Sequence, residues 1–190
     1  MANIWLTSDQ HFQHANILKF RKSYPDGEFV RPGFKDVDHM NEHMIEAWNS
    51  VVKHGEDHVY CLGDIALGNK SSWFKIFNRL QGKKRLILGN HDSSDMSRYQ
   101  PWFEKIMSWR HFGDAGVPMI ATHFPIHPNQ FHSRKAIANI HGHLHGNVVK
   151  DDKGMEDKRY INVCVEHTNY VPIHIEDIVK KVKKDVLVQK

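Results

Sequence analysis

Six short runs of apolar, β-favouring residues recur along this chain of 190 residues, each bounded by Gly, Asp, Asn or His. They cover residues 2–7, 58–62, 85–88, 118–122, 138–140 and 160–165. Continuous apolar runs of this length are typical of strands that are buried on both faces. The chain is therefore expected to fold in layers, with its strands in the interior.

Amphipathic helical patterns lie between these runs. Apolar residues recur at steps of three and four through residues 37–52, after Asp36 and before Gly55, and again through residues 71–82. Residues 175–184 predict a basic amphipathic helix whose lysines form a solvated face. Strands that alternate with helices predict an α/β layered fold. Because the strands outnumber the clear helices, we expect a core of two sheets.

The length and composition favour one compact domain, residues 1–190, since we find no repeat or linker that would divide the chain. Cys61 and Cys164 lie in apolar runs, which indicates reduced core thiols in a cytoplasmic protein rather than a disulfide framework. No window approaches the roughly 18 apolar residues of a membrane span. The net charge of +4 is mild and does not by itself demand a nucleic-acid partner, because a small anionic substrate fits as well.

Side chains that can bind a metal follow almost every expected strand. The residues are Asp9, His11, Asp64, Asn90, His91, Asp92, His123, His143 and His145. In layered α/β folds the carboxyl ends of the strands form one rim, where ligands usually bind. We therefore expect these side chains to converge.

Taken singly, most of these pieces have an ordinary structural alternative. Asp64 after a glycine fits a turn, and His123 fits a core histidine with satisfied hydrogen bonds. The segment from Gly142 to His145 is stronger, because an extended backbone would point His143 and His145 to the same side. A structural zinc site is the alternative there, but it usually needs thiolates, and the chain has no C-x-x-C pair.

The number of ligands favours two ions over one. Seven side chains are too many for a single ion, whereas two ions that share one bridging carboxylate use them all. They are Asp9, His11, Asp64, Asn90, His123, His143 and His145. Oxygen and nitrogen ligands without a thiolate favour Mn, Fe, Zn or a similar divalent ion over Ca or Cu(I). Two such ions about 3.5–4 Å apart are the usual arrangement for in-line attack on phosphorus.

Five blocks in fixed order give the chain a resemblance to the calcineurin-like metallophosphoesterase superfamily. The blocks are Asp9-Gln-His11, Gly63-Asp64, Gly89-Asn-His-Asp92, His123 and Gly142-His-Leu-His145. Residues 8–17 also resemble a small bacterial and phage-type branch of that superfamily. The resemblance implies a four-layered α/β/β/α sandwich of two mixed sheets.

The same resemblance implies a role for each site residue. The first metal would be held by Asp9, His11, Asp64 and His145, and the second by Asp64, Asn90, His123 and His143. Asp64 would bridge the two ions. His91 would be a catalytic residue that binds no metal, lying beside the scissile phosphate, and Asp92 would orient it.

The implied activity is hydrolysis of a phosphodiester or phosphomonoester by attack of a metal-bridging hydroxide, with Mn²⁺ expected and Fe, Zn, Ni or Co as alternatives. The small chain favours a small phosphodiester such as a cyclic nucleotide. A nuclease is the alternative if residues 82–85 and the lysine-rich C-terminus form one basic face. A non-catalytic metal-binding scaffold is the other alternative.

Several residues near these blocks have open roles. His14 and His141 are expected either to support the metal ligands or to pack in the core. Arg21, Arg31 and Arg134 are candidates to bind phosphate, with ordinary surface loops as the alternative.

Overall fold

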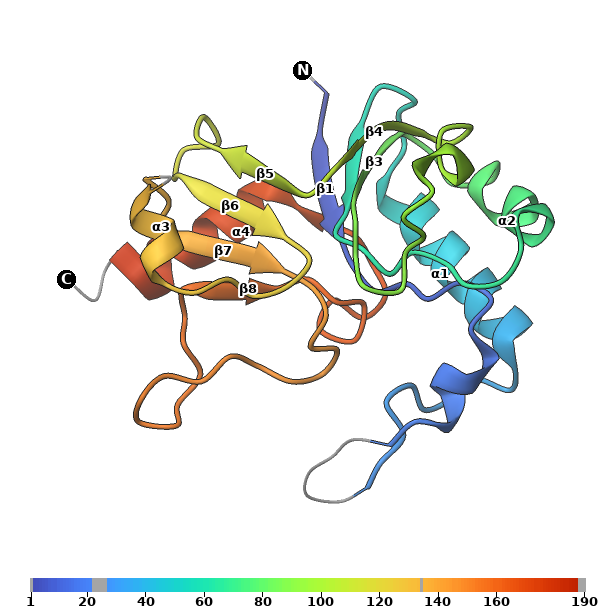
Figure 1. Ribbon diagram of the computed structural model, residues 1–190, viewed down its shortest axis with the longest axis horizontal. Coiled ribbons are helices and arrows are strands. Elements are labelled where there is room, and N and C mark those ends of the chain that lie inside the picture. Colours follow the sequence, from blue (N-terminus) through green and yellow to red (C-terminus); the bar gives the residue numbers. More distant parts are fainter. Residues whose placement is uncertain (1, 22–26, 134, 188–190) are drawn as a thin grey trace.

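Two β-sheets form the centre of the molecule (Figure 1). The computed structural model describes residues 2–21, 27–133 and 135–187. The five-stranded sheet has the order β4-β3-β2-β1-β9, with β1 (Ile4–Thr7), β2 (His58–Cys61), β3 (Lys83–Ile87), β4 (Phe103–Met107) and β9 (Ile173–His174). The four-stranded sheet has the order β5-β6-β7-β8, with β5 (Trp109–Phe112), β6 (Met119–Thr122), β7 (Ala138–His141) and β8 (Tyr160–Asn162).

Both sheets are mixed. Strands β1 to β4 run parallel to their neighbours, and β9 pairs antiparallel with β1. Strands β6, β7 and β8 are parallel, and β5 pairs antiparallel with β6. The carboxyl ends of β1, β2 and β3 in one sheet and of β6 and β7 in the other lead into the loops that the sequence singled out.

Helices cover the outer faces of the two sheets. Helices α1 (Val37–Val51) and α2 (Lys70–Phe77) pack on the five-stranded sheet, where Trp48 and Phe77 share one apolar cluster with Leu86 of β3 (Figure 1). The short helix α3 (Asn129–Ser133) covers the four-stranded sheet through Phe131, which packs with Ile120 of β6. Two 3-10 helices, Ala15–Lys19 and Met96–Arg98, complete the outer layers.

A second apolar cluster fills the space between the sheets. Leu6 and Ile87 from one sheet meet Met119 and Ile140 from the other. Helix α4 (Ile175–Val182) adds its apolar stripe to this core, including Ile178, and continues into a π-helical turn, Lys183–Leu187. The expected α/β fold with four layers, α/β/β/α, and two mixed sheets is confirmed.

The predicted elements differ from the observed ones mainly at their ends. Helix α1 begins as expected, because the Asp36 side chain accepts a hydrogen bond from the backbone N–H of His39. Helix α2 begins one residue before the predicted segment, capped by Asn69, and ends at Phe77. The run 160–165 forms a strand only as far as Asn162, after which Cys164 makes an isolated bridge to Ser8.

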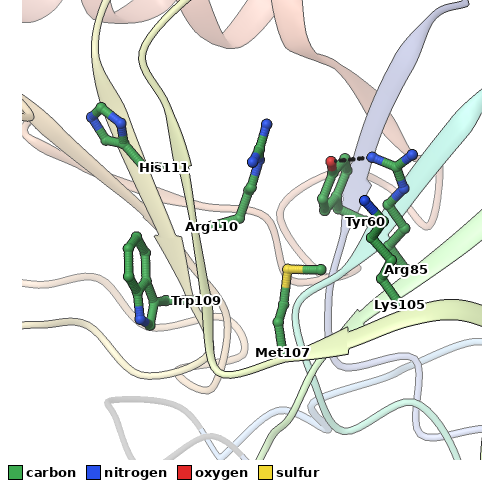
Figure 2. A pocket seen from close by; sticks show the side chains of 7 residues that line it. All are labelled: Tyr60, Arg85, Lys105, Met107, Trp109, Arg110 and His111. Carbon is green, nitrogen blue, oxygen red and sulfur yellow. Dashed lines mark hydrogen bonds between the residues drawn. The ribbon is translucent and has the colours of Figure 1, made fainter.

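The basic residues of β3 do not form the continuous basic face on which the nuclease alternative depended. Lys83 pairs with Glu56, and Lys84 is buried, donating to the carbonyl of Leu80. Arg85 points to the inner face of the sheet and donates to the Tyr60 hydroxyl at 2.6 Å (Figure 2). Because side chains alternate along a strand, Lys84 lies on the opposite face from Lys83 and Arg85.

Two further expectations concern the core and membrane-spanning segments. Cys61 and Cys164 are buried and form no disulfide. In the described ranges, no helix is both long and apolar enough to cross a membrane.

Candidate metal centre

Five loops meet at one rim of the sandwich, the edge at which β1, β2, β3, β6 and β7 end. Main-chain hydrogen bonds tie the loops together: Asp9 N donates to the carbonyl of Gly63 at 3.0 Å, and Gly142 N donates to that of His123 at 2.9 Å. The seven expected ligands, here called the rim cluster, all lie on these loops. They are Asp9, His11, Asp64, Asn90, His123, His143 and His145.

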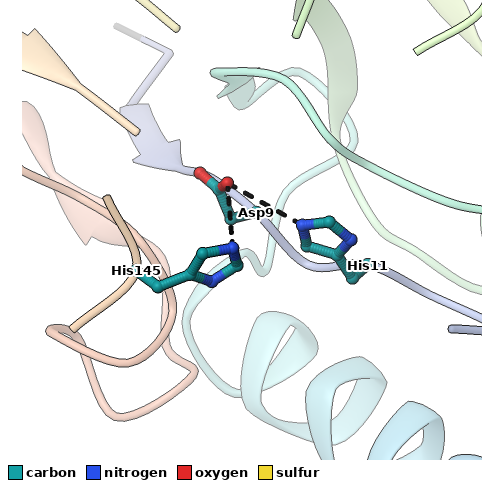
Figure 3. A group of neighbouring side chains, drawn as sticks. All are labelled: Asp9, His11 and His145. Carbon is teal, nitrogen blue, oxygen red and sulfur yellow. Dashed lines mark ion pairs between the residues drawn. The ribbon is translucent and has the colours of Figure 1, made fainter. Parts of the chain in front are cut away.

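The Asp9 carboxylate divides its two oxygens between different tasks. Its Oδ2 accepts three hydrogen bonds, from Ser8 Oγ at 2.5 Å, His143 N at 2.8 Å and Cys164 Sγ at 3.2 Å. Its Oδ1 is buried without a hydrogen-bond partner among the described residues and lies 3.9 Å from Nε2 of both His11 and His145 (Figure 3). The protein thus fixes one oxygen and leaves the other facing two imidazoles.

The Asp64 carboxylate has the same asymmetry. Its Oδ1 accepts a hydrogen bond from the backbone N–H of His91 at 2.8 Å. Its Oδ2 lies 3.6 Å from Nε2 of His11 on one side and 3.6 Å from Nε2 of His123 on the other. A single carboxylate oxygen therefore lies between two groups of imidazoles, which is the position of a bridging ligand.

Asn90 completes the second group. Its side-chain Oδ1 lies 2.9 Å from His123 Nε2 and 3.0 Å from His143 Nδ1. His123 Nδ1 lies 2.7 Å from the carbonyl oxygen of Leu62, which can only accept, so Nδ1 must carry the ring proton. In the neutral ring, Nε2 then presents a lone pair toward the oxygens of Asn90 and Asp64.

Glu166 orients His145 and was not anticipated from the sequence. Its Oε1 accepts from His145 Nδ1 at 3.0 Å and from Arg31 Nε at 2.8 Å. This places the Nδ1 proton toward Glu166 and leaves Nε2 of His145 to face Asp9. Glu166 follows the last apolar run, so the rule that found the other ligands, a polar residue at a strand end, would have found it too.

Burial and neighbouring charges shift the pKa values of the centre in both directions. Burial raises the pKa of Asp64, and burial lowers the pKa of His145 but its bond to Glu166 outweighs that effect and raises it. Burial, with the neighbouring Arg31, lowers the pKa of His11, so this ring is neutral at pH 7. Burial raises the pKa of Glu166, but its bonds to His145 and Arg31 outweigh that effect and lower it. Burial also raises the pKa of Cys164 well above its usual value, so Cys164 remains a thiol and a hydrogen-bond donor.

In the rim cluster, oxygen and nitrogen atoms with lone pairs face one another with no hydrogen atom between them. Asp9 Oδ1 and His11 Nε2 are both buried without a hydrogen-bond partner in the part of the chain described. Leaving such groups unpaired is costly, and a cation between them removes that cost. Two groups have ligand atoms close enough to hold one ion each: Asp9 with His11 and His145, and Asp9 with Asp64 and His123. The residues present therefore fit divalent metal ions.

The backbone of the rim is strained where the ligands lie. Asp9, His11, Asp64, His143 and His145 all have left-handed φ angles, between 48° and 68°. For residues other than glycine this costs about 1–3 kcal/mol each, and such strain gathers at functional sites. The expectation of an extended segment at His143 and His145 was wrong. The two rings instead point in different directions, His143 toward Asn90 and His145 toward Asp9.

His91 and Asp92 have separate positions. His91 is exposed at the rim, and its ring centroid lies 5.4 Å from that of His11. Asp92 was expected to orient His91, but its carboxylate accepts from the backbone N–H groups of Asp64, Gly89 and Ile65 at 2.8–3.2 Å. Buried main-chain donors need acceptors, and Asp92 supplies them. It therefore fixes the loop that carries Asp64.

The residues with open roles separate into three groups. His14 Nδ1 lies 3.1 Å from His11 Nδ1, so it supports a rim ligand. His141 is buried beside the Gly142 carbonyl, and burial lowers its pKa to about 4. Arg31 was a candidate for phosphate binding, but it is buried and donates to the carbonyl oxygens of Asp9 and Gln10 and to Glu166. Arg134 lies outside the described residues.

A cavity of about 790 Å³ lies beside the rim cluster. His145 and Glu166 line it together with Phe20, Arg21 and Tyr170. Arg21 lies over the Phe29 ring, with its guanidinium carbon 4.3 Å from the ring centroid. The loop after β1 therefore reaches the site, as expected, and its side chains shape the space that adjoins His145.

Comparison with known proteins establishes a family. No family model matches the chain. The uncharacterized protein MJ1445 of Methanocaldococcus jannaschii is 35% identical over 192 residues, which cover 100% of this chain and 96% of that protein. The chain belongs to the family of MJ1445. The gene 66 protein of Mycobacterium phage L5 is 29% identical over 177 residues, covering 78% of this chain and 80% of the phage protein.

Solved structures show the same fold. The crystal structure of the protein of unknown function AQ665 from Aquifex aeolicus has a TM-score of 0.70 and 26% identity, covering 95% of this chain and 99% of that one. A novel archaeal phosphodiesterase is a more remote likeness, with 18% identity, a TM-score of 0.47 and coverage of 84% and 82%. That similarity is too low to carry an argument about activity, which rests on the geometry of the rim cluster.

Proposed function

We propose that this protein is a metal-dependent phosphoesterase with two divalent ions in the rim cluster. The first ion is held by Asp9, His11, Asp64 and His145, and the second by Asp64, Asn90, His123 and His143. The observation that carries this proposal is the position of Asp64 Oδ2, which lies 3.6 Å from the Nε2 atoms of both His11 and His123. One oxygen between two sets of lone-pair donors is the arrangement that a bridged pair of cations requires.

The donor set favours Mn²⁺, with Fe, Zn, Ni or Co as alternatives, because it combines carboxylate, amide and imidazole without thiolate. When bound, such ions supply Lewis acidity toward phosphoryl oxygens and make water a competent nucleophile at neutral pH. The protein contributes the fixed positions of the ligands. Those positions are maintained by strained loops and by the supporting carboxylates Asp92 and Glu166.

His91 is the residue we assign to the leaving group. It is exposed at the rim next to His11, and in the described structure its ring makes none of the hydrogen bonds that hold the imidazoles of the rim cluster. A protonated imidazole in that position donates to the departing alkoxide oxygen, a contribution of about 10²–10⁴ in rate. Asp92 assists indirectly, because its bonds hold Asp64 and Gly89 in place.

The substrate class we propose is a small phosphodiester, of which a cyclic nucleotide is one example. The cavity of about 790 Å³ beside His145 provides room for an organic group next to the phosphate position. Its lining combines the aromatic side chain of Phe20 with the cation of Arg21. Aromatic faces and guanidinium groups suit a base and a phosphate, respectively.

The test is a hydrolysis screen of the purified protein with added Mn²⁺. The substrates are p-nitrophenyl phosphate, bis-p-nitrophenyl phosphate, and 2′,3′- and 3′,5′-cyclic nucleotides. We expect the diesters to be hydrolysed faster than the monoester, and all activity to stop after chelation. Mn²⁺ that binds without hydrolysis of any substrate would favour the non-catalytic scaffold, and a protein that binds no metal would contradict the proposal.

A further inference from the structure

A second polar cavity lies where the chain crosses from one sheet to the other, between β4 and β5. Its volume is about 370 Å³, and it shares no lining residue with the rim cluster. We call it the cationic cavity, lined by Tyr60, Arg85, Lys105, Met107, Trp109, Arg110 and His111 (Figure 2). Arg85 precedes Gly89 by four residues, roughly 13 Å of strand. The cationic cavity is therefore separate from the candidate metal centre.

Three cations converge on this cavity from three different strands. Arg85 comes from β3, Lys105 from the adjacent β4, and Arg110 from β5 of the other sheet (Figure 2). The pairing of Arg85 with Lys105 places both on the inner face of the five-stranded sheet. Like charges that are held together by neighbouring strands repel one another unless a counter-charge lies between them.

The described part of the chain supplies no such counter-charge. No carboxylate lines the cavity, and neither Lys105 nor Arg110 forms an ion pair with any described acid. The charge of Glu104, the neighbouring acid on β4, instead favours the protonated forms of Lys83, Lys84 and His58. The charge of the cavity is therefore available to an anion from solution.

Two residues that line this cavity carry polar atoms without a partner in the described structure. The Arg85 guanidinium is fixed by Tyr60, at 2.6 Å, and its Nη2 lies 3.2 Å from His58 Nε2. Its Nε is buried without an acceptor in the described structure, and His111 Nε2 is likewise buried without a partner. Buried polar atoms normally find partners, so these two unpaired atoms mark the lining of the cavity as incompletely satisfied.

We infer that the cationic cavity binds a phosphate group, either as inorganic phosphate or as part of a nucleotide. Two guanidinium groups and one ammonium match the charge and the several acceptor oxygens of a phosphate dianion. The Tyr60 hydroxyl provides a further polar contact. This site does not depend on the metal centre, because none of its residues is a proposed metal ligand.

The experiment is calorimetric titration of the full-length protein in excess chelator, so that metal-dependent binding at the rim is absent. Inorganic phosphate and AMP are titrated separately into the wild type and into Lys105→Gln and Arg110→Gln, whose side chains are exposed. The matched control is Lys75→Gln, which removes an exposed lysine from α2 on the other side of the five-stranded sheet. Thermal unfolding of each variant verifies that it is folded.

We expect one saturable site for inorganic phosphate, weakened about tenfold by either cavity variant and unchanged by Lys75→Gln. AMP that binds as phosphate does indicates recognition of the phosphate alone, and tighter binding of AMP indicates that the cavity also contacts the nucleoside. Absence of saturable binding of both ligands would overturn the inference. Equal weakening by all three variants would also overturn it, because phosphate would then respond to the overall positive charge of the protein and not to this cavity. Failure of hydrolysis at the rim would leave these titrations unaffected.

Discussion

At the scale of single residues, several side chains of the candidate centre bond one polar atom to the protein and direct the other to the centre. Asp9 gives Oδ2 to three protein donors and leaves Oδ1 buried and unpaired in the described structure. His123 and His145 each direct Nδ1 to an oxygen of the protein, the Leu62 carbonyl and the Glu166 carboxylate, and present Nε2 to the centre. Holding Nδ1 in this way selects the tautomer whose Nε2 lone pair is free to bind a metal.

The two most informative substitutions separate ligation from catalysis. We expect Asp64→Ala to lose metal and hydrolysis together, because Asp64 Oδ2 faces both groups of imidazoles. His91→Ala should keep its metal and lose about 10²–10⁴ in rate, because its ring is assigned to the leaving group. Metal content by atomic absorption and initial hydrolysis rates measure both effects. Equal loss of metal in the two variants would mean that His91 is a ligand.

Glu166 offers a test of the support behind His145. Glu166→Gln removes the charge that holds the Nδ1 proton of His145 and pairs with Arg31. The affinity for Mn²⁺ should fall about 10–100-fold, as for other residues that orient metal-bound histidines. Glu46→Gln, an exposed change on α1, is the control and should leave the affinity unchanged. Calorimetric Mn²⁺ titration measures it, and an unaltered Glu166→Gln affinity would refute this role.

Glycine at position 142 is required by space rather than by backbone angle. A Cβ there would overlap the Ser8 hydroxyl and Asp9 Oδ2. We expect Gly142→Ala to lower the free energy of unfolding by about 1–3 kcal/mol and to weaken metal binding by displacing Asp9. Gly146→Ala in the same loop is the matched control, since a Cβ there has nothing within 4 Å. Urea unfolding and metal titration compare the two, and equal effects would contradict the steric explanation.

At the scale of elements, the sequence predicted the strands that are continuously apolar and missed those that are not. Strands β1, β2, β6 and β7 were found because burial on both faces leaves an apolar run. Strand β3 was found only from the apolar residues that follow its three basic ones, Lys83, Lys84 and Arg85. Strand β4 mixes Glu104 and Lys105 with apolar residues, and β5 carries Arg110 and His111. β9 has only two residues, too few to give a pattern. These edge and short strands form because they pair with an adjacent strand, not because their own sequence has a strand pattern.

The sequence likewise predicted some features of the site and missed others. Sequence order predicted that the expected ligands lie together, because each follows a strand and the carboxyl ends of parallel strands share one rim. The left-handed conformations of His143 and His145 were not predicted, because they occur in the loop after β7, whose His143 N–H is bonded to Asp9 of the other sheet's first loop. The role of Arg31 was also missed. Its neighbours in the sequence give no sign that residues 135 positions away bury it.

Helix α4 provides a prediction at the scale of an element. Ile178 is fully buried in the core between the sheets, so Ile178→Ala should lower the free energy of unfolding by about 2–5 kcal/mol. Lys180 lies on the exposed face and pairs with Asp177 in a solvated contact. Lys180→Ala should change stability by less than about 1 kcal/mol. Chemical denaturation measures both, and a cost below 1 kcal/mol for Ile178→Ala would mean that α4 is dispensable to the core.

At the scale of the whole molecule, the sandwich brings together segments that are as far apart in the sequence as Asp9 and Cys164, 155 positions. The hydrogen bond from His143 N to Asp9 and the bridge between Ser8 and Cys164 join the two sheets directly beneath the rim cluster. We therefore expect the proposed metal centre and the packing of the sheets to be coupled, because ions bound there would hold loops of both sheets. The cationic cavity lies at a different crossing between the sheets and uses other residues.

The most direct measurement of this account is X-ray diffraction from crystals grown with Mn²⁺, using the anomalous signal of manganese. The account predicts two peaks about 3.5–4 Å apart. One should lie among Asp9, His11 and His145, the other among Asn90, His123 and His143, with Asp64 between them. A single ion, or manganese bound elsewhere while the rim cluster stays empty at saturating Mn²⁺, would contradict it.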